Sequence, residues 1–135
     1  MVITKDELLR APADEYMNDE QLAFFRQLLE DLRRETMDNI EAAKQQLASP
    51  PKMNDEADRA SYEEESLVTL RIVDRERRLL PKIDAAKKRI ASGDYGYCLE
   101  TGEPIGILRL LARSTAELCA EAKTLNERRE FNYRR

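Results

Sequence analysis

Apolar residues recur every three or four positions along most of the chain, which is the spacing of a narrow stripe on a helix. The first stripe follows Asn18, a predicted N-cap with Gln21 three residues later. About 30 residues at 1.5 Å per residue predict a rod of roughly 45 Å, and so narrow a stripe favours coiled-coil pairing. The stripe is broken only at Thr36 and comprises Leu22, Phe25, Leu29, Leu32, Ile40, Ala43 and Leu47.

A second stripe, from about Asp58 to Ala91, predicts a helix of similar length. Pro50 and Pro51 cannot continue the first helix, so the segment between the stripes predicts a short turn and an antiparallel hairpin. Pro81 lies inside the second stripe, where we expect it to kink the helix. The inner face is expected to comprise Leu67, Leu70, Val73, Leu80, Ile83 and Ile90.

The two ends of the chain are predicted to form smaller pieces. Thr4 and Glu7 have the spacing of a capping box for a short helix in an arm of residues 1–17. Gly93 ends the second long helix, and Ser114 with Thr115 offers a cap for a last helix at about 116–132. The predicted fold is mainly α: the arm, a coiled-coil hairpin over 18–91 with its tip near 49–60, and a small module over 92–135 with a strand, a turn, a strand and a C-terminal helix.

Charge makes up 37% of the 135 residues, which favours long solvated helices over a large core. The net charge of -4 argues against bulk affinity for nucleic acid. The signs separate along the second helix, with an acidic excess over residues 50–74 and a basic excess over residues 75–91. A solvated coiled-coil surface accounts for many charge runs. Separation along one axis instead predicts an acidic tip and a basic root with different tasks.

Several protein classes are disfavoured by what the sequence lacks. No apolar run approaches the roughly 18 residues of a membrane span, and MVITKDELLR does not have the pattern of a signal peptide. These features predict a cytoplasmic protein with reduced cysteines and no membrane contact. The sequence has no histidine, phosphate-binding loop or evident nucleophile–base pair, so we do not expect an enzyme.

The two cysteines have the spacing of half a zinc finger. Cys98 is followed three residues later by Thr101, and Cys119 by Ala122, where a four-thiolate site would have a second cysteine in each pair. Completing a tetrahedral zinc site would need carboxylates, a poor set for zinc. We therefore predict a module without metal, held by packing around this vestigial site. The nearby carboxylates are those of Glu100, Glu103, Glu117 and Glu121.

Three stretches in order carry a family resemblance: EYMNDEQLAFFRQLLE at 15–30, DEADRASYEEESLVTLRIVDRERRLLPKI at 55–83, and GDYGYC at 93–98 with IGILRLLARSTAELC and KTLNERRE behind it. Together they resemble the DksA/TraR family of bacterial RNA polymerase regulators, over the chain from about residue 13 onward. The missing second and fourth cysteines and the short arm are similar to the cysteine-poor, zinc-independent members of that family.

The resemblance implies a monomer that inserts its coiled coil into the secondary channel of RNA polymerase and does not bind DNA sequence-specifically. It implies that this factor acts with ppGpp in the stringent response, repressing ribosomal RNA promoters and activating promoters of amino-acid biosynthesis. Arg75 is matched to a polymerase contact. The tip residues implied are Asp55, Asp58 and Ala60, and the ppGpp-binding residues implied are Leu79, Lys82, Arg113 and Lys123.

Simpler interpretations stay open at this stage. The two tip carboxylates would also stabilise the first turn of a helix through its dipole. A nonspecific coiled-coil adaptor is an alternative from another class, and it predicts that Asp55 and Asp58 are dispensable. A thiol redox sensor using Cys98 and Cys119 is a third hypothesis, weakened because no neighbour in the sequence clearly lowers a thiol pKa.

Overall fold

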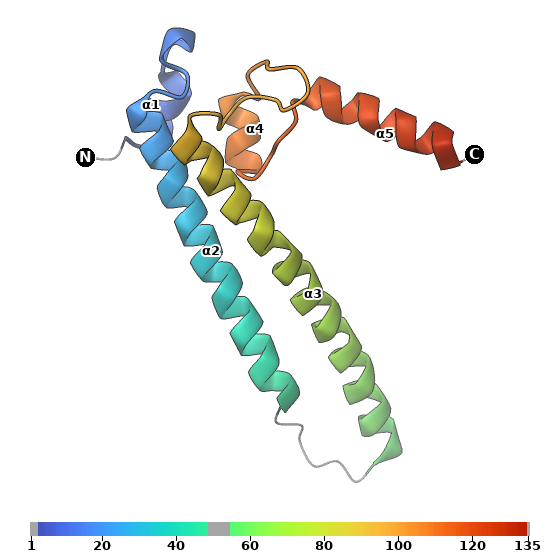
Figure 1. The fold of residues 1–135 in the computed structure, drawn as a ribbon. Coiled ribbons are helices and arrows are strands. Elements are labelled where there is room, and N and C mark those ends of the chain that lie inside the picture. The colour runs from blue at the N-terminus through green and yellow to red at the C-terminus, as the bar shows by residue number, and fades with distance from the viewer. Residues whose placement is uncertain (1–2, 49–54, 135) are drawn as a thin grey trace. The chain divides into compact units, whose positions relative to one another are not determined.

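The computed structural model describes residues 3–48 and 55–134. Among these residues the only β pairing is an isolated bridge between Tyr97 and Pro104. The mainly α fold class is confirmed. The elements in order are α1 (Lys5–Arg10), the 3-10 turn η1 (Ala13–Glu15), α2 (Asp19–Ala48), α3 (Glu56–Ser92), α4 (Ile107–Ala112) and α5 (Ala120–Arg134) (Figure 1).

The long helix α2 begins where its sequence predicts. The Asn18 side chain accepts a hydrogen bond from the Gln21 N–H at 2.9 Å, and the Gln21 side chain accepts one from the Met17 N–H at 2.9 Å. These two bonds satisfy backbone donors that a helix start leaves open. At the start of α1, Thr4 accepts a hydrogen bond from the Glu7 N–H at 3.2 Å, as the capping pattern predicts.

Helices α2 and α3 run antiparallel and pack along one another, which confirms the two-helix coiled coil (Figure 1). The predicted turn at Pro50 and Pro51 lies outside the described residues. Helix α3 continues through Pro81 as a single element, with the proline exposed; the predicted kink there stays a prediction. No helix within 3–48 or 55–134 is both long and apolar enough to span a membrane.

The chain forms two compact units, Met1–Glu30 with Asp84–Arg135 and Asp31–Ile83. The core of the first unit joins α1, α2, α4 and the segment after α3. Its Phe25 and Tyr95 rings lie 5.5 Å apart between centroids, and both side chains are fully buried. Burying one such aromatic or aliphatic side chain contributes about 1.5–3 kcal/mol. The other apolar residues of this core that are at most 1% exposed are Leu8, Leu29, Ala86 and Leu110.

The second unit contains the seam between α2 and α3, and here one sequence prediction is wrong. Leu67 and Leu70 are 56% and 50% exposed, whereas Val73 is only 6% exposed. Leu70 and Leu67 lie three and six residues before Val73. Each step of three residues turns the side chain by about 60° around the helix axis, away from the partner helix. The seam instead follows the spacing of four, three and four through Tyr62, Ser66, Thr69 and Val73, the first three of which are half-buried.

The finger-like module also differs from its prediction. It contains α4 and an isolated bridge in place of a strand–turn–strand unit. Helix α5 begins four residues later than expected, and Ser114 and Thr115 are buried instead of capping it. Cys119 takes the capping position: its sulfur accepts a hydrogen bond from the Ala122 N–H at 3.4 Å, and its carbonyl accepts one from Lys123 at 3.0 Å. Cysteine is not among the usual N-cap residues, so the pattern did not indicate this start.

Candidate functional site

The acidic tip residues lie at the beginning of α3. The Asp55 side chain accepts a hydrogen bond from the Ala57 N–H at 3.0 Å, and its carbonyl accepts one from Arg59 at 3.1 Å. Asp55 is therefore the N-cap of α3, and Asp58 lies in the first turn. Both carboxylates and Ala60 are exposed to solvent. The start of α3 thus presents two exposed carboxylates to solvent.

A basic stripe lies further along the same helix. It comprises Arg71, Arg75, Arg78 and Lys82, whose spacing of four, three and four places them on one face of α3. These side chains and Leu79 line a shallow hollow together with Asp74 and Glu76. In this hollow, the structure brings together the predicted polymerase contact Arg75 and the predicted ppGpp residues Leu79 and Lys82.

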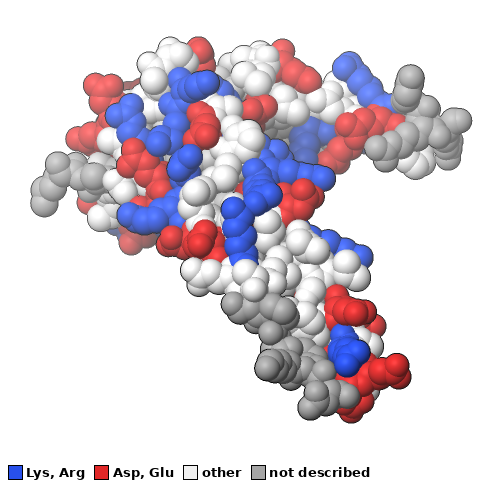
Figure 2. Space-filling view, turned by 60° about the horizontal axis from the view of Figure 1, so that its bottom comes forward, with Lys and Arg blue, Asp and Glu red and all other residues white. Residues whose placement is uncertain are grey.

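Sequence reasoning missed two members of the basic stripe. Arg71 and Arg78 line the same hollow, and Arg78 pairs with Asp74 at 2.9 Å between Nη2 and Oδ2. Both side chains of that pair are largely exposed, so the pair contributes little to stability. The helical spacing of the four cations was the signal that could have identified the stripe from sequence. Figure 2 shows acidic side chains gathered at the end of the rod where α3 begins.

The other two predicted ppGpp residues belong to the first unit. Arg113 follows the last turn of α4 and is exposed, while its backbone N–H donates to the Arg109 carbonyl at 2.8 Å. Lys123 lies in the first turn of α5 and is half-buried. Leu79 and Lys82 are in the second unit. The approach of all four residues to one ligand therefore stays a prediction.

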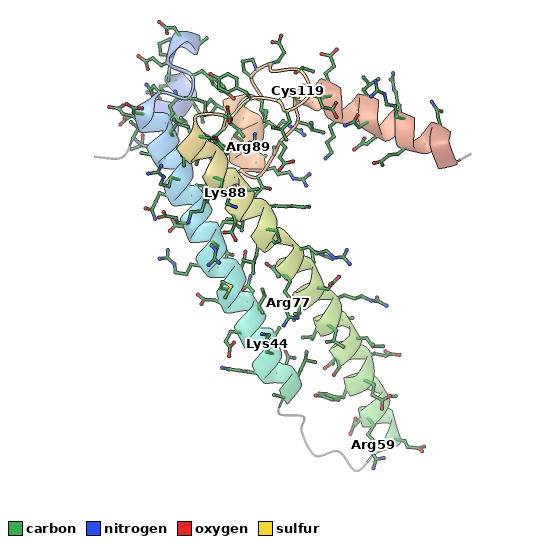
Figure 3. The ribbon with its side chains drawn as sticks, viewed as in Figure 1. Lys44, Arg59, Arg77, Lys88, Arg89 and Cys119 are labelled. Atoms are coloured by element: carbon green, nitrogen blue, oxygen red, sulfur yellow. The ribbon has the colours of Figure 1, made fainter. Side chains whose placement is uncertain are left out.

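Buried residues and hydrogen bonds surround the predicted vestigial finger site. Cys98 and Ala122 are both 3% exposed, and Cys119 is half-buried at the start of α5 (Figure 3). The Thr101 hydroxyl lies 3.9 Å from the Cys119 sulfur and accepts a hydrogen bond from the Glu103 N–H at 3.2 Å. A backbone hydrogen bond also joins the segments that carry the two cysteines, because the Leu99 N–H donates to the Glu117 carbonyl at 2.9 Å.

The environment of Cys98 changes its acidity. Burial raises the pKa of the Cys98 thiol. Hydrogen bonds from the Thr101 side chain and from the backbone of Cys119, Thr101 and Glu100 together outweigh this effect and lower the pKa to about 6. The expectation that nothing near either cysteine lowers a thiol pKa is therefore wrong for Cys98. The donors are the Thr101 side chain and uncharged backbone groups, which a search of the sequence for neighbouring charges does not identify.

These residues do not fit a structural zinc ion. Zinc in such sites takes four tetrahedral ligands, mostly thiolates and imidazoles. Two of the four corners here hold a buried methyl group, from Ala122, and a hydroxyl, from Thr101. Within the described part of the chain, no group of three or more histidine, cysteine, aspartate or glutamate side chains could hold a metal ion.

The chain thus combines an antiparallel pair of long helices with a small finger-like module. Two family models match in this order along the chain: "DnaK suppressor protein DksA, N-terminal domain" over residues 21–90, and "Prokaryotic dksA/traR C4-type zinc finger" over residues 93–128. The chain therefore belongs to the DksA/TraR family, as the resemblance indicated.

Similar proteins support this family assignment. The chain is 40% identical over 138 residues to the RNA polymerase-binding transcription factor DksA of Caulobacter vibrioides, covering 99% of this chain and 95% of the relative. It is 45% identical over 123 residues to the Escherichia coli protein of that name, covering 88% and 80%. The solved structure of transcription factor DksA2 from Pseudomonas aeruginosa is similar with a TM-score of 0.82 and 50% identity, covering 94% of this chain and 98% of that one.

Proposed function

We propose that this chain binds RNA polymerase and modulates the initiation of transcription, with the coiled coil placed in the secondary channel of the enzyme. The observation that carries the proposal is the match along nearly the whole chain to proteins named RNA polymerase-binding transcription factors. A regulator of this kind acts in the cytoplasm as a monomer and needs no chemistry of its own. Its partner supplies the active centre.

The acidic tip is the effector in this proposal. Asp55 and Asp58 are exposed and held at the start of a 37-residue helix, so their charges can reach a partner without rearrangement of the chain. Carboxylates near the catalytic centre would change the field around its bound metal ions and nucleotides. Ala60 extends this surface by an exposed small side chain that allows close approach.

The basic stripe of α3 supplies affinity. Arg75 and its neighbours offer several cations on one face, a pattern that matches acidic protein surfaces or phosphate groups. Lys82 and Leu79, joined by Arg113 and Lys123 of the first unit, bind ppGpp at the interface with polymerase. Diphosphate groups suit this set because arginine makes bidentate contacts and lysine a compact point charge. In this role ppGpp strengthens the effect of the factor during the stringent response.

The module works without zinc in this proposal. Ala122 fills one corner of the former site with an apolar group, and the Cys119 sulfur accepts the hydrogen bond that starts α5. Packing and hydrogen bonding thus replace coordination. Such a factor would keep regulating polymerase in cells that are short of zinc.

The test is transcription in vitro from a ribosomal RNA promoter with purified polymerase, with and without this protein and with and without ppGpp. We expect repression by the protein alone and stronger repression with ppGpp, and activation at a promoter for amino-acid biosynthesis. A nonspecific adaptor would bind polymerase and leave initiation unchanged. That result would reject the regulatory function while leaving the family assignment intact.

A further inference from the structure

Two leucines of α3 lie outside the seam between the long helices and are exposed to solvent. Leu67 and Leu70 are 56% and 50% exposed. Leu67 also lines a hollow of about 510 Å³ together with Leu47 of α2 and the half-buried Tyr62. Leu70 is the neighbour of Leu67 one helical turn further on. We call these four residues the side strip; it is an apolar surface of the second unit that the fold of one chain leaves uncovered.

Charges of opposite sign lie before and after the side strip along α3. Residues 55–65 contain six acids and one base, whereas residues 71–82 contain five bases and two acids. Glu63 and Arg77 are both exposed and lie seven residues before and seven residues after Leu70. Seven residues are close to two helical turns, so these three side chains share one face of α3. Along the chain, this face is first negative, then apolar, then positive.

Such an order is complementary to itself when a second copy is turned end for end. A twofold axis through Leu70 brings the side strip against its own copy and places Glu63 of each chain opposite Arg77 of the other. A parallel arrangement would oppose like charges, which disfavours it. Within one chain, Glu63 and Arg77 are separated by 14 residues of helix, about 21 Å at 1.5 Å per residue, so they cannot pair with each other.

We propose that the side strip binds a second copy of this chain in an antiparallel dimer with twofold symmetry. The apolar area is small and each chain carries a net charge of -4, so the association should be weak and should require high protein concentration. Dimerisation does not depend on the proposed function, but its consequence does: a channel that admits one hairpin excludes the dimer. The dimer would then be a reserve form that releases the active monomer on dilution.

The first test measures the mass of the full-length protein by sedimentation equilibrium at low ionic strength and rising concentration. We expect the mass of wild-type protein to rise from 15.7 kDa towards twice that value. Leu67→Ser/Leu70→Ser should weaken the dimer about tenfold or more, because it removes two apolar side chains from each copy. The matched control is Val68→Ser/Ile72→Ser, which should dimerise as wild type. These two residues are 52% and 43% exposed but lie on the other flank of α3.

An exchange of charges tests the antiparallel arrangement. Glu63→Lys creates two like-charged pairs in the dimer, and so does Arg77→Glu, so each variant alone should associate about tenfold more weakly. An equimolar mixture of the two variants should regain the association, because each mixed dimer has one original and one exchanged pair of opposite charges. Net charge alone predicts the opposite for Glu63→Lys, which changes the net charge from -4 to -2.

Two results would overturn the inference. One is wild-type protein that stays at 15.7 kDa at every concentration. If Leu67→Ser/Leu70→Ser then weakens binding to polymerase, the side strip is a polymerase contact instead. The other is a dimer that persists in this variant and is not regained in the mixture of charge variants, which would place the contact elsewhere on the chain. Dimer formation without any effect on transcription would reject the proposed function and leave this inference standing.

Discussion

The hydroxyl of Tyr16 donates a 2.6 Å hydrogen bond to the Gly96 carbonyl, eighty residues away in the sequence. The same oxygen accepts a bond from the Gly106 N–H at 2.9 Å, and the ring meets Tyr97 edge-on with centroids 5.6 Å apart. Gly96 has a φ of 93°, and a Cβ there would lie 2.7 Å from the Met17 side chain. These contacts pack the segment before α2 directly against the finger within the first unit.

Tyr16→Phe should lower the free energy of unfolding by about 1–3 kcal/mol, because it leaves two part-buried backbone groups without their partner. Urea unfolding followed by circular dichroism measures the change. Tyr97→Phe is the matched control, since it removes a hydroxyl from the neighbouring ring and keeps the Tyr16 bonds. Equal losses in the two variants would show that the Tyr16 hydroxyl has no special role.

Sequence patterns were sufficient for the long helices and insufficient for the finger. The start of α2 was predictable because Asn18 and Gln21 act within one turn of each other. The start of α5 was not, because Cys119 caps it through geometry that the folded loop creates. Leu67 and Leu70 misled the seam prediction, since apolar character alone cannot choose between helical faces that both carry apolar residues. Arg75 and Lys82 of the stripe could be placed on one helix from sequence, whereas Arg71 and Arg78 were missed because their shared helical face was not compared.

Asp55→Asn or Asp58→Asn should abolish the effect on transcription and leave polymerase binding nearly unchanged, because in the proposed function the tip acts at the active centre of polymerase and the stripe supplies affinity. Asn caps a helix as well as Asp does, so Asp55→Asn should not alter stability. In vitro transcription and a binding titration with polymerase measure the two effects. Glu64→Gln, an exposed acid further along α3, is the control and should behave as wild type. Much weaker binding by the tip variants would make the carboxylates affinity determinants.

Lys82→Ala, Arg113→Ala or Lys123→Ala should reduce the additional effect of ppGpp more than the effect of the protein alone. Losing one charge-assisted phosphate contact costs about 1.5–3 kcal/mol, which a titration of ppGpp in the transcription assay can resolve. Lys44→Ala removes an exposed cation of α2 outside the stripe and serves as the control (Figure 3). Synergy that survives in all three variants would remove the nucleotide site from this protein.

Tyr95 makes the stability of the first unit sensitive to alkali. Burial raises the pKa of Tyr95 above its ordinary value of 10.0, although Arg89 nearby lowers it in part, and the hydroxyl donates to the Ser114 carbonyl at 2.7 Å. The unfolded chain loses this proton near pH 10 while the folded chain keeps it. The contribution is therefore fully present below pH 10 and is lost as the pH rises further.

Tyr95→Phe separates this effect from the other groups that titrate in alkali. The variant should be about 1 kcal/mol less stable at neutral pH, because the Ser114 carbonyl loses its donor. Above pH 10 the gap between the two proteins should narrow. Urea midpoints for both proteins at neutral pH and at about pH 11 measure the difference. A gap that stays constant across this range would mean that Tyr95 ionises equally easily in both states.

Zinc dependence is the property in which this chain should differ most from family members that retain four cysteines. We expect the protein to purify without stoichiometric zinc and to keep its melting temperature when a strong chelator is added. Where a finger depends on metal, coordination is part of the folding free energy and chelation unfolds it. Here the buried Ala122 methyl and the hydrogen bonds to the Cys119 sulfur supply contacts that a chelator cannot remove.

Cysteine variants extend the same prediction. Cys98→Ser and Cys119→Ser should retain the effect on transcription, with a loss of about 1–2 kcal/mol at most where a buried hydroxyl replaces a thiol. The loss should be larger for Cys98, which is 3% exposed, than for the half-buried Cys119. Elemental analysis of the purified protein and thermal melting with and without chelator test whether the module folds without zinc. One tightly held zinc per chain, released together with the fold, would mean that other residues complete the site and that packing alone does not hold the module.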